Sequence, residues 1–205
     1  MSAPPDRDNG LTQQEIDYLA GRAPDPEPEE SRIERWRPGW LVAGLTFATF
    51  GLYLFIWGGV HWAEMKRQLK DDRMYPVWHA LAIMTPIYGY FRLHANYRVM
   101  NELLDTTSSP IRTRPMLVIG TILMAHLLAL MPIEDLLIQV LSLAAILGAI
   151  SWILHHGQTG MNAYWDAKPS IKTSSQIRRW EKIVLFMGGF LWWMFLSALV
   201  FEMAT

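Results

Sequence analysis

The stretch RPMLVIGTILMAHLLALMPIEDLLIQVLSLAAILGAISWILHH, residues 114–156, decides the fold class of this chain. It holds two apolar runs, 116–131 and 136–154, joined by a very short turn. So short a turn makes two helices antiparallel neighbours. Glu134 and Asp135 stand at the start of the second run, where the dipole of a helix favours negative charge. The stretch therefore predicts a helical hairpin.

Three further apolar segments accompany this hairpin. A hydrocarbon core about 30 Å thick needs about 20 apolar residues of helix. A soluble protein of 205 residues can bury one such helix, but not several. We therefore predict an all-α, polytopic helical membrane protein with about five membrane segments: 40–62, 77–92, 116–131, 136–154 and 183–203.

The second segment, YPVWHALAIMTPIYGYFRL (75–93), is short and is broken by proline. Only 15 residues separate Pro76 from Arg92, and Pro86 interrupts any helix there. We expect a kink at Thr85–Pro86 and a helix over 88–104. The segment either re-enters the side from which it came or crosses as a short span. Counting the basic residues of the loops does not decide between these two topologies, because each leaves several on the wrong side.

Residues 1–38 are predicted to form an acidic, Pro-rich and largely disordered tail. They carry nine acidic residues against five Arg, and too few apolar residues for a core. Thr12 and Glu15 form a capping box that predicts a short helix over 13–20. This helix is either nascent in solvent or a docking peptide for a partner. The N-terminus has no apolar run typical of a cleavable signal peptide.

Small residues recur at helical spacing in two of the apolar segments. Such stripes let a second helix approach closely. In 40–62 they lie at intervals of four and seven, and in 136–154 at an interval of four. The residues predicted to pack helices are Gly44, Ala48, Gly51, Gly58, Ala145 and Ala149.

Ionisable residues suggest lipid contacts rather than catalysis. Arg92, Arg98, Arg112 and Arg114 form a predicted patch for anionic lipid headgroups. His126 lies alone within an apolar segment, where an ionisable residue is a candidate functional site. Haem at His126 is the alternative, but no other His matches its expected depth. We therefore expect a neutral His126 bonded to a neighbouring helix, with no cofactor.

No enzyme, metal or nucleic-acid signature accompanies these features. The chain has no Cys, and its six His and its carboxylates show no metal-ligand spacing. It has no phosphate-binding loop, nucleophile elbow, zinc-protease motif or dinucleotide fingerprint. The basic residues cluster in loops, which is typical of orientation in a membrane rather than of nucleic-acid binding.

The segment YPVWHALAIMTPIYGYFRL together with GQTGMNAYW (157–165) resembles a group of uncharacterised bacterial polytopic membrane proteins. The resemblance covers residues 45–165 and implies an inner-membrane location without naming functional residues. Our leading hypothesis is a non-catalytic accessory or assembly subunit of a membrane complex, with other membrane subunits as partners. A small transporter or channel component is the alternative, and a haem- or quinone-linked redox protein is the third hypothesis.

Overall fold

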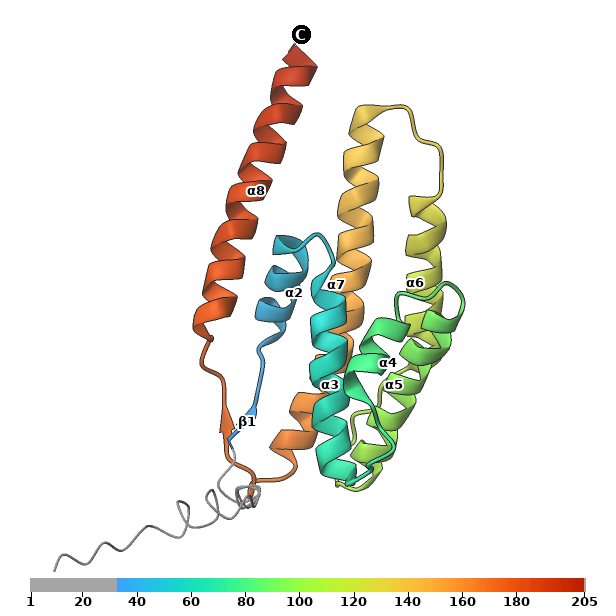
Figure 1. Cartoon of the computed structure of the whole chain (residues 1–205), viewed down its shortest axis with the longest axis vertical. Helices are drawn as coiled ribbons and strands as arrows, with labels where there is room; N and C mark the ends of the chain where they lie inside the picture. The colour runs from blue at the N-terminus through green and yellow to red at the C-terminus, as the bar shows by residue number, and fades with distance from the viewer. Residues whose placement is uncertain (1–32, 205) are drawn as a thin grey trace, which may run out of the picture. The chain divides into compact units, whose positions relative to one another are not determined.

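The computed structural model describes residues 33–204, and Figure 1 shows its course. The chain divides into two units, Met1–Ile33 and Glu34–Thr205, of which the second is described below by itself. The predicted helix at 13–20 lies outside the described residues. Residues 34–38, which were assigned to the tail, belong instead to the folded unit, because Glu34, Arg35 and Arg37 are buried there.

The folded unit is all-α apart from one two-residue strand pair. Strand β1 (Glu34–Arg35) pairs in parallel with β2 (Thr173–Ser174). The seven helices of the described residues are α2 (Gly39–Ala48), α3 (Tyr53–Leu69), α4 (Pro76–Ala82), α5 (Tyr88–Asp105), α6 (Pro115–Ala129), α7 (Leu136–Asp166) and α8 (Arg179–Ala204).

The first predicted membrane segment is not one helix, and this corrects the expectation of a single span over 40–62. Two helices, α2 and α3, meet at a turn in which Phe50 and Gly51 have φ angles of 50° and 88°. Such positive angles end a right-handed helix, and glycine tolerates them best. The hydroxyl of Thr49 donates to the carbonyl of Leu45 at 2.8 Å and accepts the amide of Tyr53, the first residue of α3, at 2.9 Å.

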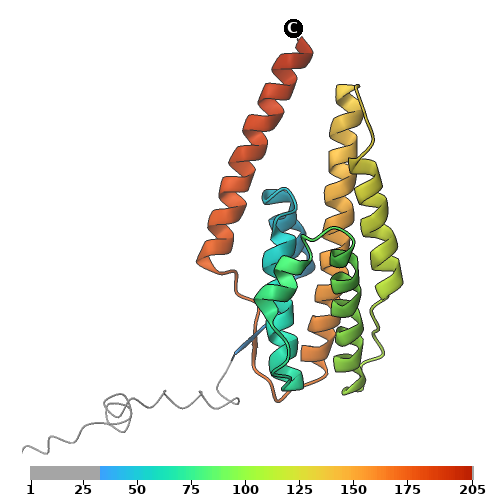
Figure 2. The same cartoon turned by 45° about the vertical axis from the view of Figure 1, so that its right-hand side comes forward.

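The chain reverses direction at this turn. Arg37, just before α2, forms an ion pair with Glu64, in the second half of α3, at 2.9 Å. In one straight helix these 27 residues would be about 40 Å apart at about 1.5 Å per residue. Figures 1 and 2 show α2 and α3 as the two arms of a hairpin.

A second hairpin follows, with its break where the sequence predicts it. Helix α4 ends at Ala82, α5 begins at Tyr88, and Pro86 lies in the turn between them. The two arms touch closely at the turn, because a Cβ on Gly89 would lie 2.3 Å from the carbonyl oxygen of Ile83. With seven residues, α4 is only about 10 Å long.

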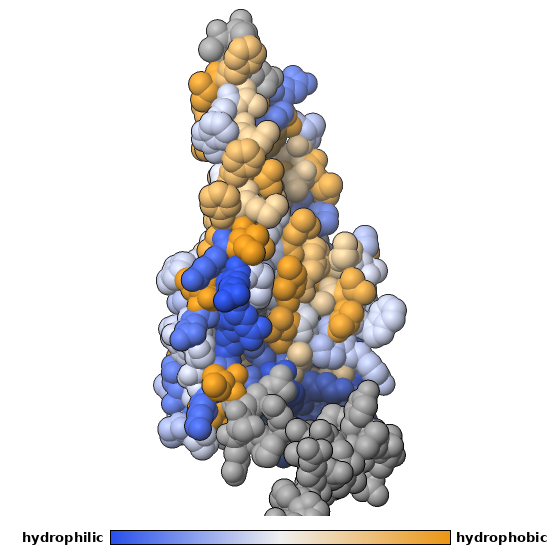
Figure 3. Space-filling model, turned by 60° about the vertical axis from the view of Figure 1, so that its left-hand side comes forward, coloured by the Kyte–Doolittle hydropathy of each residue, from blue (hydrophilic) through white to orange (hydrophobic). Residues whose placement is uncertain are grey.

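Helices α7 and α8 are each long and apolar enough to cross a membrane, whereas α2 and α6 are shorter apolar helices. The predicted hairpin of α6 and α7 is present, with Asp135 capping α7 through the amide of Ile138 at 2.9 Å. Helix α7 runs twelve residues beyond its predicted end at 154. Exposed large apolar side chains are numerous on α6, the first half of α7 and α8. Figure 3 shows apolar residues over the upper part of one face and hydrophilic residues below them.

Two hydrophobic clusters hold the unit together. The first lies between α2, α3, α5 and α7 and includes Leu41, Leu45, Trp57, Tyr97 and Leu154. The second lies between the lower halves of α3, α5 and α7, around Met65, Met100, Leu104 and Tyr164. The second half of α7 is therefore buried, whereas its first half is largely exposed.

Candidate functional site

The small residues predicted to pack helices contact different partners rather than one. Because the helix breaks at Gly51, they do not share one face. A Cβ on Gly44 would lie 3.3 Å from Leu185 of α8, and one on Gly58 would lie 3.0 Å from Ile83, just beyond α4. A Cβ on Gly51 would lie 3.1 Å from Ile150 of α7.

The remaining small residues also face specific helices. Ala48 of α2 lies directly against Gly188 of α8. A Cβ added to Gly188 would lie 2.4 Å from the Cβ of Ala48. Ala145 and Ala149 line an apolar hollow between α6 and α7, opposite Gly120, Met124 and Leu128.

The four arginines predicted to bind lipid headgroups do not converge. Arg92 bonds the hydroxyl of Tyr88 at 2.7 Å and lies over its ring at 5.0 Å. Arg98 pairs with Glu102 at 3.8 Å, and Arg112 pairs with Asp105 at 2.9 Å. The backbone amide of Arg114 donates to Nε2 of His156 at 3.1 Å. Their headgroup role stays a prediction.

His126 lies on the exposed side of α6. Its ring makes an edge contact with Tyr90 of α5, with ring centroids 6.2 Å apart. The described residues contain no group of three or more His, Cys, Asp or Glu that could hold a metal ion. The contact with Tyr90 joins α6 to the start of α5.

The polar residues that the structure does bring together form a buried seam that the sequence analysis did not identify. We define the polar seam as Arg37, Trp57, His61, Glu64, Asn96, Gln158 and Asn162. At one end, Arg37 pairs with Glu64 through two bonds of 2.9 and 3.3 Å. Asn162 completes this end, because its amide donates to the carbonyl of Arg37 at 2.7 Å and its oxygen accepts the amide of Arg37 at 3.3 Å.

The seam continues along α7 and crosses to α3 and α5. Gln158 donates to Asn162 at 2.9 Å and accepts the indole of Trp57 at 3.2 Å. Trp57 stacks on His61 with ring centroids 4.4 Å apart, and Nδ1 of His61 bonds Oδ1 of Asn96 at 2.9 Å. Each of these side chains is at least nine-tenths buried. The seam therefore fixes the register of three helices.

Two more ion pairs flank the seam and secure the strand pair. Glu34 pairs with Arg67 of α3 at 2.9 Å. Arg35 pairs with Glu181 in the first turn of α8, and Glu181 also accepts the amide of Arg178 at 2.8 Å. These contacts tie the segment before α2 to α3 and to α8.

The electrostatics of the seam indicate a structural role. Burial raises the pKa of the Glu64 carboxyl, and Arg37 opposes this rise. Burial acts to lower the pKa of Arg37, but the Glu64 carboxylate raises it overall. A buried pair of this kind is costly when one partner is removed. Within the seam, Nε2 of His61 and Nδ2 of Asn96 are buried without a hydrogen-bond partner.

No family model, curated protein or solved structure matches the chain. The resemblance to bacterial membrane proteins, drawn from residues 75–93 and 157–165, therefore stays a prediction. Within those stretches the structure assigns clear positions to several polar residues. Gln158 and Asn162 belong to the polar seam, and Gly157 admits Trp57, whose ring would lie 2.6 Å from a Cβ at that position.

Proposed function

We propose that the protein is an integral membrane protein with three crossings and two half-depth hairpins. In this topology α6, the first half of α7 and α8 cross the bilayer. The hairpins α2–α3 and α4–α5 enter from one side and return to it. Two helix lengths support this topology, compared with a hydrocarbon core of about 30 Å. Helix α2 is about 15 Å long and reaches half of this depth, whereas the stretch of α7 before His156 is about 30 Å long and spans it.

Charge supports this topology. Neither residues 115–167 nor the residues after Lys182 contain Lys or Arg. If both hairpins return, the segments that carry Lys and Arg lie on one side, and Arg92, in the second turn of α5, is the basic residue closest to the turn of a hairpin. The positive-inside rule makes that side the cytoplasm, and in a bacterium the membrane would be the inner membrane. A single span over 40–62 would place the four basic residues of 63–75 on the opposite side from the tail.

We infer from one observation that the protein is a non-catalytic accessory or assembly subunit of a membrane complex. Among the described helices, α8 packs on α2 but makes no extended contact with any other. Only 6% of the residues in the most apolar stretch of α8 are buried. Its outward face carries Phe186, Phe190 and Trp193 at spacings of four and three, with exposed fractions of 79%, 54% and 65%. Aromatic side chains of this kind are frequent at the centre of protein interfaces.

Native mass spectrometry from mild detergent tests this function. We expect a second membrane protein to co-purify with the wild-type chain. The amount of co-purified partner should fall at least about tenfold in the double variant Phe186→Ala/Phe190→Ala. Each aromatic truncation at an interface centre costs on the order of 1–2 kcal/mol. Met116→Ala, which removes an equally exposed apolar side chain from α6, is the control. A wild-type chain that purifies alone under all mild conditions would contradict the proposal.

A further inference from the structure

A groove between α7 and α8 is closed at half its depth. Helix α2 packs against both α7 and α8, whereas α7 and α8 make no extended contact with each other. Because α2 ends at Ala48, it fills only the part of this space next to the seam. Figures 1 and 2 show the upper parts of α7 and α8 standing apart beyond the end of α2.

Aromatic side chains form the floor of the groove. Phe50, in the turn after α2, stacks on Trp192 of α8 with ring centroids 4.7 Å apart, and it meets the edge of Phe195 at 6.5 Å. The indole of Trp192 also donates to the carbonyl of Phe47 at 2.7 Å. These contacts seal the end of α2 against α8.

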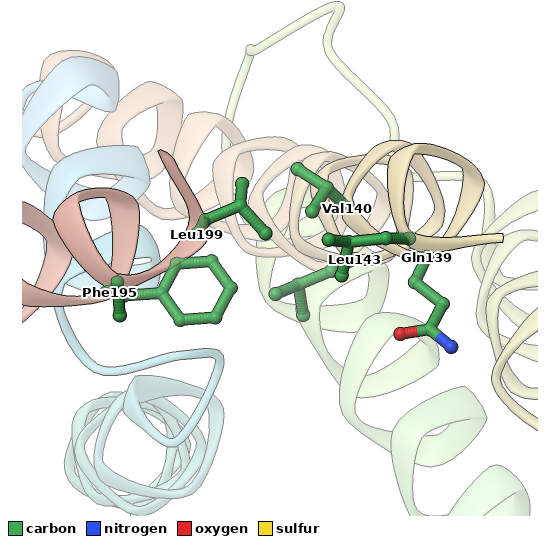
Figure 4. A pocket seen from close by; sticks show the side chains of 7 residues that line it. Gln139, Val140, Leu143, Phe195 and Leu199 are labelled. Atoms are coloured by element: carbon green, nitrogen blue, oxygen red, sulfur yellow. The ribbon is translucent and has the colours of Figure 1, made fainter. Parts of the chain in front are cut away.

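The space beyond this floor is apolar and large enough for a ligand. It has a volume of about 390 Å³, within the usual range of about 300–1,000 Å³ for ligand pockets. Gln139 is the polar side chain of its lining, and its amide donates to the carbonyl of Ile133 at 2.6 Å. Figure 4 shows Phe195 and Leu199 facing Val140 and Leu143 across the space. Leu136 and Ala198 complete the lining.

The length of the groove selects its occupant. From Trp192 to Phe201, α8 extends about 14 Å beyond the floor, which is about half of a hydrocarbon core of about 30 Å. A partner helix that crosses the whole bilayer would collide with α2 and its aromatic floor. The acyl chain of a lipid in one leaflet has the required length and polarity. We propose that this groove binds an acyl chain of a phospholipid from the leaflet opposite the basic face.

The charges at the mouth select the headgroup. Glu134 and Asp135 are exposed at the start of α7, and no Lys or Arg occurs in 115–167 or after Lys182. An anionic headgroup would find no cation there. A zwitterionic lipid with an ammonium group finds a carboxylate in Glu134, while Asp135 caps α7. This assignment rests on the membrane orientation proposed above and goes beyond the proposed subunit role.

Photo-crosslinking in vesicles tests the site on the unmodified protein. The full chain is reconstituted into vesicles of phosphatidylethanolamine and phosphatidylglycerol, with a trace of either lipid carrying a diazirine in its acyl chain. We expect the phosphatidylethanolamine probe to label Val140, Leu143 and Leu199 at least fivefold more than Leu141, which is exposed outside the groove. Equal labelling of all four residues would mean contact with bulk lipid only and would overturn the proposal. Preferential labelling by phosphatidylglycerol would overturn the headgroup assignment.

A matched pair of variants tests retention of the lipid. Leu143→Trp fills the groove, whereas Leu141→Trp adds the same bulk two residues away. Native mass spectrometry of the detergent-extracted proteins should find the retained phosphatidylethanolamine reduced at least fivefold in Leu143→Trp and unchanged in Leu141→Trp. Thermal unfolding of both variants controls for folding. Retention by Leu143→Trp at the wild-type level would overturn the site. Because the crosslinking experiment uses the chain reconstituted alone, its result does not depend on whether a partner subunit exists.

Discussion

Replacing Arg37 with Ala should destabilise the folded unit by about 3–5 kcal/mol, because the change leaves the buried Glu64 carboxylate without its counter-ion. The two side chains are 7% and 3% exposed and make two mutual bonds. The bonds of Asn162 to the backbone of Arg37 remain in the variant, so the loss reports on the ion pair. Denaturant titration in mild detergent measures the change in the free energy of unfolding.

The double variant Arg37→Met/Glu64→Leu separates a lost charge pair from lost packing. Apolar replacements of similar volume often restore the stability of a broken buried pair. We therefore expect the free energy of unfolding of the double variant to lie within about 1 kcal/mol of the wild-type value. A double variant as unstable as Arg37→Ala would contradict the assignment of the loss to an unpaired Glu64.

The deficit of Arg37→Ala, meaning its loss in free energy of unfolding relative to the wild type, should also depend on pH. Burial already raises the pKa of Glu64, and loss of Arg37 removes the main opposing interaction. The folded variant then holds a proton on Glu64 at pH values where the unfolded chain, with a pKa of about 4.3, has released it. Because the folded state binds more protons, its free energy of unfolding falls as pH rises above about 4.3. The deficit should thus be larger at about pH 8 than at about pH 5.

Replacing Gly188 with Ala should loosen α8 from α2. The new Cβ would lie 2.4 Å from Cβ, 2.5 Å from Cα and 2.5 Å from the carbonyl oxygen of Ala48. Two of these three atoms are backbone, so the helices must move apart, at a cost of about 1–3 kcal/mol. Hydrogen exchange should accelerate in α2 and α8 and remain unchanged in α5 and α6.

The adjacent glycine is the matched control. A Cβ on Gly189 meets no atom within 4 Å, and alanine is favoured over glycine within a helix by about 0.5–1 kcal/mol. Gly189→Ala should therefore keep or raise the thermal unfolding midpoint that Gly188→Ala lowers. Equal effects of the two substitutions would contradict the close crossing of α2 and α8.

Local signals in the sequence predict much of this fold. The apolar runs at 116–131 and 136–154, the short turn with Asp135, and the break at Pro86 all appear in the structure close to where they are expected. Each rests on physics within a few residues: apolar length, capping by a side chain, or the missing amide of proline. The all-α class follows from these signals.

The turn at Thr49–Leu52 could not be predicted in the same way. Gly51 fits equally well into a stripe of small residues along one helix. Only the positive φ of Gly51 in the structure shows that it belongs to a turn. The bond from the Tyr53 amide to the Thr49 hydroxyl exists only once this turn has formed. Distant contacts, above all the pairing of Arg37 with Glu64, favour the turn over a straight helix.

The polar seam was missed for a related reason. Its members come from four separate segments, and no motif joins Arg37, Glu64, Asn96 and Gln158 along the chain. Gln158 and Asn162 lie at a spacing of four on a helix that was expected to end at 154. Residues 155–166 lie outside the predicted membrane segments, and their burial depends on packing against α3 and α5.

Labelling of single cysteines by an impermeant maleimide tests the central claim, that the α2–α3 and α4–α5 hairpins return to the side from which they enter. The chain has no native Cys, so labelling of each introduced residue in intact cells and in inverted vesicles is unambiguous. We expect cysteines at Ile33, Asp72, Ser108 and Ser175 to react from one side, and a cysteine at Glu134 to react from the other. Labelling of Asp72 from the side opposite to Ile33 would make the 40–62 region a true crossing and contradict the account.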